Sequence, residues 1–228
     1  MTRSFAAYGM LLDRGLTLEQ LDLAYDVAVA DPNPKTNRRR LTIALRDMVS
    51  EQEAEGKTKK CLTRVWLNPP PDAAAMIAWA RAQSVQRQNR QIFHFAAVLA
   101  TFPFVGSVCR VIGQHLQTEQ AVEAQVVRAG VRRLLGDRPS VDVAARKTYT
   151  TLKNLGLLEQ NKQVVLRPRE PLSCDHELAG MLAHALMLTR GAGSLPESSL
   201  PEAPELLGVG HSLLSAAGES CNHEHEGP

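Results

Sequence analysis

The sequence predicts a mainly α-helical protein that contains one short β-hairpin. Apolar residues recur mostly at the three- and four-residue spacing of helices. Sustained alternation of apolar and polar residues is almost confined to residues 157–167, and aromatic residues are scarce beside leucine, alanine and valine. The 228 residues suffice for one large or two small hydrophobic cores.

Two helices are expected near the N-terminus. Thr17 and Gln20 have the spacing of a capping box, and the helix that follows should stop before the Asp-Pro-Asn-Pro run at residue 31. Thr36 is the expected N-cap of the second helix, and Gly56 its end. A short loop would let the two helices pair antiparallel.

The second helix begins with three consecutive cations, Arg38, Arg39 and Arg40. In a first turn the helix dipole disfavours cations by ~0.3–1 kcal/mol each, and a bound phosphate would offset that cost. Alternatively, and with equal weight, no phosphate binds there, and salt and solvent screen the charges of the three exposed arginines. The following "GKTKKCLTRVW", with further lysines, has strand-like character after Cys61, and Asp72 should cap another helix.

Residues 91–109 form the most apolar stretch of the chain and approach the ~20 residues that a membrane span requires. The stretch contains His94, Thr101, Gly106 and Ser107, which suit a protein core better than lipid. We therefore expect two buried helices broken near Pro103, in a protein that is cytoplasmic and not membrane-bound. A membrane-associated protein is the alternative.

A helix from Thr118 to Leu135, ended by Gly136, should precede a second helix with Ser140 as its N-cap. Gly156 would end that second helix in a Schellman motif, and "LLEQ" and "QVVLR" would form two strands around a tight turn. Helix, turn, helix and hairpin is the order of a winged helix-turn-helix, whose second helix enters the DNA major groove.

The second helix has two different faces at ~100° per residue. One is an apolar stripe that should be buried: Val141, Ala145, Thr148, Leu152 and Leu155. The other carries donors suited to phosphates and base edges: Arg146, Lys147, Thr150, Lys153 and Asn154. With Lys162 in the wing and Arg38, Arg39 and Arg40, these residues are the predicted DNA-binding site. The alternative is a surface helix with solvated charges.

Charge is divided unevenly along the chain. Residues 1–169 contain 25 Lys and Arg against 15 Asp and Glu, a net charge of +10, whereas residues 170–228 contain 1 against 9, a net charge of −8. A basic body suggests a polyanion partner, here double-stranded DNA. We expect a helical region (1–89), a winged helix-turn-helix (90–169), and a C-terminal helix with an acidic, flexible tail (170–228).

The motifs of common enzymes and metal sites do not occur. "HELAG" at His176 begins like a zinc-protease signature, but Gly180 stands where the second histidine is needed. The sequence has no phosphate-binding P-loop and no nucleophile elbow. No two of the four cysteines have the spacing of a zinc site or a redox pair, so we expect free cytosolic thiols: Cys61, Cys109, Cys174 and Cys221. We expect a protein that is not an enzyme and needs neither cofactor nor metal.

Three segments carry a resemblance to a known family: "FHFAAVLATFPFVGSVCRVIG", "VRRLLGDRPSVDVAARKTYTTLKNLGLLE" and "VVLRP". Their layout resembles that of BrxA, the small DNA-binding protein of BREX phage-defence systems. The resemblance implies an all-α protein with helix-turn-helix or winged-helix elements, and it assigns DNA reading to the helix of Arg146, Lys147 and Lys153. The likeness covers residues 37–168.

Two hypotheses of function follow. The first is a double-stranded DNA-binding protein that is a component or a transcription regulator of a bacterial phage-defence system, self-associated as many winged-helix proteins are. The second is a protein-interaction adaptor without a DNA role, whose basic face meets an acidic partner and whose leucine- and methionine-rich helix (174–189) lies in a partner's groove.

Overall fold

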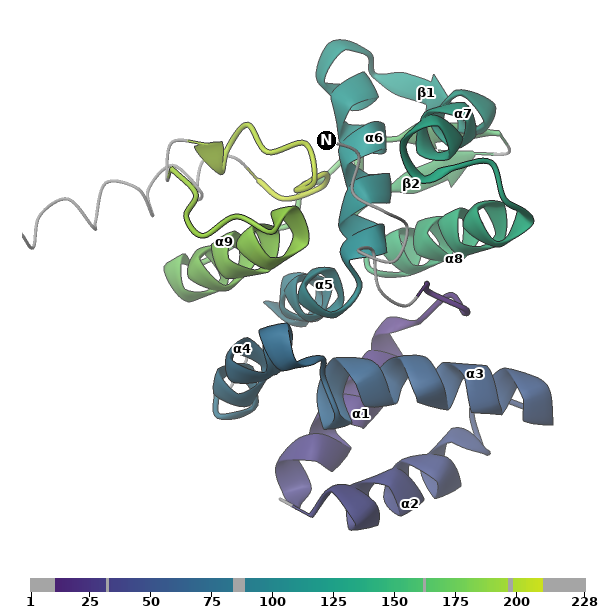
Figure 1. The fold of residues 1–228 in the computed structure, drawn as a ribbon, viewed down its shortest axis with the longest axis vertical. Helices are drawn as coiled ribbons and strands as arrows, with labels where there is room; N and C mark the ends of the chain where they lie inside the picture. The colour runs from purple at the N-terminus through teal and green to yellow at the C-terminus, as the bar shows by residue number, and fades with distance from the viewer. Residues whose placement is uncertain (1–10, 32, 84–88, 162, 197–198, 211–228) are drawn as a thin grey trace, which may run out of the picture.

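The computed structural model describes residues 11–31, 33–83, 89–161, 163–196 and 199–210. Within these residues the protein is mainly helical and has a small three-stranded antiparallel sheet (Figure 1). The predicted fold class is confirmed at this level.

The N-terminal part consists of helices that lie together at the bottom of Figure 1. They are α1 (Leu18–Ala30), α2 (Pro34–Leu45), α3 (Gln52–Leu62) with a π-helical turn η2 (Thr63–Leu67), and α4 (Pro71–Arg81). The predicted capping box is present, because the Gln20 backbone N–H donates to the Thr17 hydroxyl and the Thr17 N–H donates to the Gln20 side chain. Trp66 is fully buried in the core of this part.

Several predicted helix boundaries in this part are wrong. Asn33, not Thr36, caps α2, since its Oδ1 accepts the Lys35 N–H at 3.0 Å and Pro34 fills the first helical position. Arg38, Arg39 and Arg40 therefore lie beyond the first turn, where the dipole penalty has faded. Gly56 lies inside α3 rather than at a helix end.

Two further local predictions are corrected. The "GKTKKCLTRVW" segment is helical and not strand-like, because its buried residues Cys61, Leu62, Val65 and Trp66 recur at helical spacing. At the next helix Pro70 occupies the N-cap position, and Asp72 sits in the first turn.

Helices α5 (Arg90–Thr101) and α6 (Pro103–Thr118) meet at an elbow of 114°. Pro103 lacks the N–H that would continue α5, and it starts α6 instead. Ten consecutive residues of α5, from Ile92 to Thr101, are buried, so the prediction of two buried helices broken near Pro103 is confirmed. No described helix by itself has the length and apolar character to cross a membrane, although the bent α5–α6 pair has them jointly.

The sheet follows α6. Strand β1 (Ala121–Glu123) leads into α7 (Ala124–Leu135) and α8 (Pro139–Asn154), and then into β2 (Glu159–Asn161) and β3 (Val164–Leu166). The strand order is β1-β3-β2, with both pairs antiparallel and Val122 opposite Val165. The predicted single helix from Thr118 to Leu135 is wrong, because residues 121–123 pair with β3.

Both ends of α8 are defined by proline and glycine. Arg138 takes the N-cap position and Pro139 the first helical position, so Ser140 is not the predicted cap. Gly156 adopts φ 73°, and the Leu157 N–H donates to the Leu152 carbonyl at 2.9 Å, which confirms the Schellman motif. The predicted hairpin is present as β2 and β3.

The C-terminal part is more ordered than the sequence predicted. Helix α9 (His176–Arg190) begins at Asp175 as N-cap and ends at the left-handed Gly191. Residues 199–210, which fall within the tail predicted to be flexible, pack against the core, with Leu200, Leu206 and Val209 buried. Residues 211–228, the rest of that predicted tail, lie outside the described residues.

A buried carboxylate fixes this C-terminal segment. The side chain of Glu205 is fully buried and accepts hydrogen bonds from Arg110 Nε at 2.8 Å and from Arg190 Nε and Nη2 at 3.0 and 2.7 Å. Burial raises the pKa of Glu205, but the two guanidinium groups outweigh it and hold the pKa below its ordinary value of 4.5.

We predict that Glu205→Gln lowers the free energy of unfolding by about 3 kcal/mol at pH 7, because two guanidinium groups lose their buried anion. Glu202→Gln, an exposed change in the same segment, should have little effect. A carboxylate with a depressed pKa stabilises the fold above its unfolded-state pKa. The difference between wild type and Glu205→Gln in urea titrations should therefore shrink as the pH falls below 4.5. Equal stability at pH 7 would contradict this account.

Candidate nucleic-acid interface

Helix α8 buries one face and leaves the predicted DNA-reading side chains outside the core. The apolar stripe is buried as predicted: Val141, Ala145, Thr148, Leu152 and Leu155. Arg146, Thr150, Lys153 and Asn154 are exposed, and Lys147 is half-buried. The two faces of the helix are thus divided as the sequence predicted.

An ion-pair cluster joins α7 to α8. The Arg132 guanidinium makes two hydrogen bonds to Asp142, one of them from Nε to Oδ1 at 2.9 Å, and it lies 3.5 Å from Asp137. The hydrogen bonds from Arg132 lower the pKa of Asp142. The cluster spans the turn between the two helices, where Gly136 has φ 95°.

This cluster contains every acidic residue of the α7–α8 pair. Residues 124–154 contain seven Lys and Arg and two Asp, and both aspartates face Arg132. Among the described residues, five cations of the pair form no salt bridge, although Arg128 and Arg146 interact with Asp142 at longer range: Arg128, Arg133, Arg146, Lys147 and Lys153. The pair therefore carries a positive charge that the chain does not neutralise locally.

The N-terminal segment, residues 11–17, runs against the C-terminal half of α8. The Leu16 N–H donates to Thr151 Oγ1 at 2.9 Å, and Asn154 Nδ2 donates to the Leu16 carbonyl at 2.9 Å. A Cβ on Gly15 would lie 2.6 Å from Thr150 Cγ2, so only glycine permits this approach. Asn154 and Thr150, predicted to face DNA, instead contact the chain's own segment.

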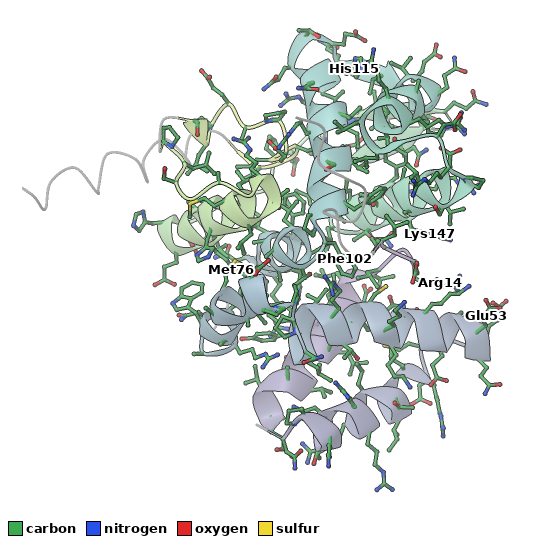
Figure 2. The ribbon with its side chains drawn as sticks, in the orientation of Figure 1. Arg14, Glu53, Met76, Phe102, His115 and Lys147 are labelled. Atoms are coloured by element: carbon green, nitrogen blue, oxygen red, sulfur yellow. The ribbon has the colours of Figure 1, made fainter. Side chains whose placement is uncertain are left out.

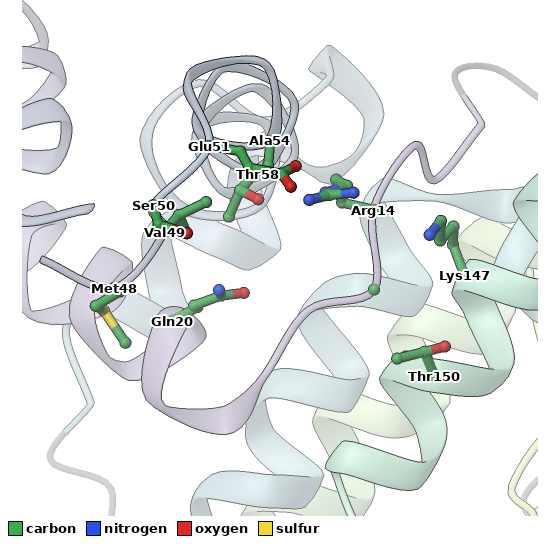
Figure 3. A pocket seen from close by; sticks show the side chains of 11 residues that line it. Arg14, Gln20, Met48, Val49, Ser50, Glu51, Ala54, Thr58, Lys147 and Thr150 are labelled. Atoms are coloured by element: carbon green, nitrogen blue, oxygen red, sulfur yellow. The ribbon is translucent and has the colours of Figure 1, made fainter. Parts of the chain in front are cut away.

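A polar pocket of about 420 Å³ lies beside this contact, between α3, α8 and the N-terminal segment (Figure 3). Lys147 and Thr150 line it from α8, and Arg14 lines it from the segment. Figure 2 shows Arg14 and Lys147 on the same side of the molecule, between α8 and α3. The predicted face of α8 is thus divided: Lys147 and Thr150 belong to the pocket, and Arg146 and Lys153 do not line it.

The structure does not bring the other predicted DNA-binding residues to α8. Arg38, Arg39 and Arg40 are exposed on α2, and α3 lies between α2 and α8 in the view of Figure 1. Arg40 lies 3.8 Å from Asp31. Lys162 lies outside the described residues, so its predicted role in the wing stays a prediction.

Sequence reasoning missed three cations. Arg128 and Arg133 are exposed on α7, and their signal was the excess of arginine over acidic residues within that helix. Arg14 carried no signal, because its place beside Lys147 depends on contacts between segments more than 130 residues apart.

The described residues offer little for metal or thiol chemistry. In those parts of the chain, no three His, Cys, Asp or Glu side chains converge as metal ligands. Cys61, Cys109 and Cys174 are buried free thiols, and burial raises their pKa values, that of Cys174 to about 12. Such thiols are poor nucleophiles.

Comparison of the chain with known protein families, with curated proteins and with solved structures finds no match.

Asn154→Ala should lower stability by about 1 kcal/mol, because the hydrogen bond to the Leu16 carbonyl is lost. Arg146→Ala and Lys153→Ala remove side chains with no ion pair and should change stability by less than about 0.5 kcal/mol. Thermal and urea unfolding of the three variants measure this contrast. If Asn154→Ala proved as stable as wild type, the segment would not be held by this contact.

Proposed function

We propose that the protein is a non-enzymatic double-stranded DNA-binding protein built on a winged helix-turn-helix. The observation that carries the proposal is the order α6, β1, α7, α8, β2, β3 together with the strand order β1-β3-β2. In a winged helix a three-helix unit supports a small antiparallel sheet in this order, and the last helix enters the major groove. We assign the role of that last helix to α8 and the role of the wing to β2 and β3.

Electrostatics support the same proposal. Phosphate neutralisation supplies much of the affinity of DNA-binding proteins, and the α7–α8 pair offers five cations that form no salt bridge with a described residue. Arg146 and Lys153 are seven residues apart, about two helical turns, and so project from the same side of α8. They are the pair best placed to contact one duplex.

The neighbours of α8 limit how it can dock. The N-terminal segment contacts Thr151 and Asn154, and α3 forms the opposite wall of the pocket next to Lys147. Helix α8 therefore offers an edge, with Arg146 and Lys153, rather than its whole polar face. We expect few base contacts and an affinity dominated by phosphates, hence strongly dependent on salt.

The cellular setting is a further part of the proposal and rests on the resemblance to BrxA. It makes the protein a cytoplasmic component or regulator of a bacterial phage-defence system, self-associated on its DNA. Pull-down of tagged protein from cells that carry its gene neighbourhood tests this. Recovery of defence-system proteins is the expected result, and a set of unrelated partners would contradict it.

The adaptor hypothesis keeps its basic face but loses the apolar face of α9 as a surface for a partner. The apolar residues of α9 face the chain's own core, since Leu178, Met181, Leu182 and Leu186 are buried. The helix therefore cannot lay that face in a partner's groove while the fold is intact.

The proposal predicts a specific change in salt dependence. Arg146→Gln and Lys153→Gln should each weaken binding to a duplex and lower the slope of log affinity against log salt by ~0.9 per lost phosphate contact. Fluorescence anisotropy with unrelated duplexes, from low to moderate salt, measures the slope. Circular dichroism should stay unchanged, because both side chains are exposed.

Two controls separate charge from folding. Lys57→Gln removes an exposed cation that is paired with Glu53 on α3, and it should leave the slope unchanged. Leu152→Ala truncates a fully buried side chain and should cost ~2–5 kcal/mol of stability, losing binding only as the protein unfolds. Arg39→Gln in the same titration tests the predicted role of α2. An unchanged affinity and slope in the Arg146→Gln/Lys153→Gln double variant would remove α8 as the DNA-binding helix.

A further inference from the structure

The pocket between α3, α8 and the N-terminal segment holds two cations that form no salt bridge with a described residue, although Arg14 interacts with Glu53 at longer range. Arg14 enters from the segment and Lys147 from α8, and neither forms an ion pair with a described residue. In the view of Figure 3 the Arg14 guanidinium lies between Lys147 and Thr58. Glu51 also lines the pocket but is not paired with either cation. Two like charges directed into one cavity favour an anionic ligand.

A hydroxyl that lines the same pocket makes no hydrogen bond within the described chain. Thr58 is 2% exposed as a residue, but its oxygen is open to the pocket rather than sealed in the core. Other helical threonines in this protein, Thr42, Thr101 and Thr148, donate to the carbonyl four residues earlier. The Thr58 hydroxyl is therefore free to donate to a ligand in the pocket.

One further donor reaches the pocket wall. Gln20 uses its Oε1 in the capping box, which leaves its side-chain NH2 group as a donor. Helix α3 begins at this wall with Glu51 as N-cap. The carboxylates of Glu51, Glu53 and Glu55 offset the dipole of this helix end, so the donors of the pocket are side chains.

We propose that this pocket binds the phosphate group of a ligand, with Arg14 and Lys147 as charge partners and Thr58 as a hydroxyl donor. The volume of about 420 Å³ exceeds that of a single phosphate and lies within the ~300–1,000 Å³ of small-molecule sites. A phosphorylated small molecule fits these features. A backbone phosphate of duplex DNA has the same chemistry, and that second source rests on the proposed DNA-binding function.

Isothermal titration calorimetry of the full chain with pyrophosphate tests the first source. Wild-type protein should bind, and Arg14→Gln and Lys147→Gln should each weaken binding at least about tenfold, the effect of losing one charged hydrogen bond. Lys57→Gln, which removes a paired cation from the same helix as Thr58, should bind like wild type. Thr58→Val should weaken binding without lowering the melting temperature, because it replaces an unpartnered hydroxyl with a methyl group.

Duplex titrations of the Arg14→Gln/Lys147→Gln double variant test the second source. Suppose that wild type does not bind pyrophosphate, and that the slope of log affinity for the duplex against log salt is lower by ~1.8 in the double variant than in wild type. This difference corresponds to two phosphate contacts, so the DNA backbone supplies the phosphate. If the protein binds pyrophosphate but no duplex, the proposed phosphate site is supported and the proposed DNA-binding function is contradicted. The inference is overturned if the double variant, folded by circular dichroism, equals wild type with both ligands.

Discussion

Pro103 cannot continue helix α5, and the 114° elbow that it imposes determines how the two ends of the chain meet. Helix α5, buried along most of its length, packs against α1, α4, η2 and α9. Helix α6 leaves the elbow in another direction and supports β1, α7 and α8. Because one apolar stretch serves both parts, the sheet-bearing part is attached to the N-terminal helices through shared core rather than through a linker.

This attachment explains the state of α8. The N-terminal segment buries Leu12 and Leu16 in the core, and the backbone of Leu16 bonds to both Thr151 and Asn154. Part of the polar face of α8 is thereby used to hold the fold together. What remains is an exposed edge with Arg146 and Lys153 and an open pocket with Lys147. One helix thus combines a structural contact with the two places at which we propose that phosphates bind.

The sequence predicted the features that depend on local chemistry. The Thr17 capping box, the break near Pro103, the glycine ends of α7 and α8 and the β2–β3 hairpin all follow from residues a few positions apart. It failed where distant partners decide. Strand β1 exists because Val122 meets Val165, and Glu205 is buried because Arg110 and Arg190 converge on it. Likewise, nothing near Asn154 indicates that it holds Leu16, so local spacing predicted which face of α8 is buried but not which of its polar side chains contact the chain itself.

The central claim is that the exposed edge of α8 lies against duplex DNA. Its most direct test is photocrosslinking from a benzophenone amino acid at Val143, which is 40% exposed on α8, with Val29 on α1, 50% exposed, as the comparison position. The account predicts a covalent adduct with a duplex of about two helical turns from position 143, suppressed by added salt, and none from position 29. Adducts of equal yield from both positions, or none from position 143 while the duplex is bound, would contradict it.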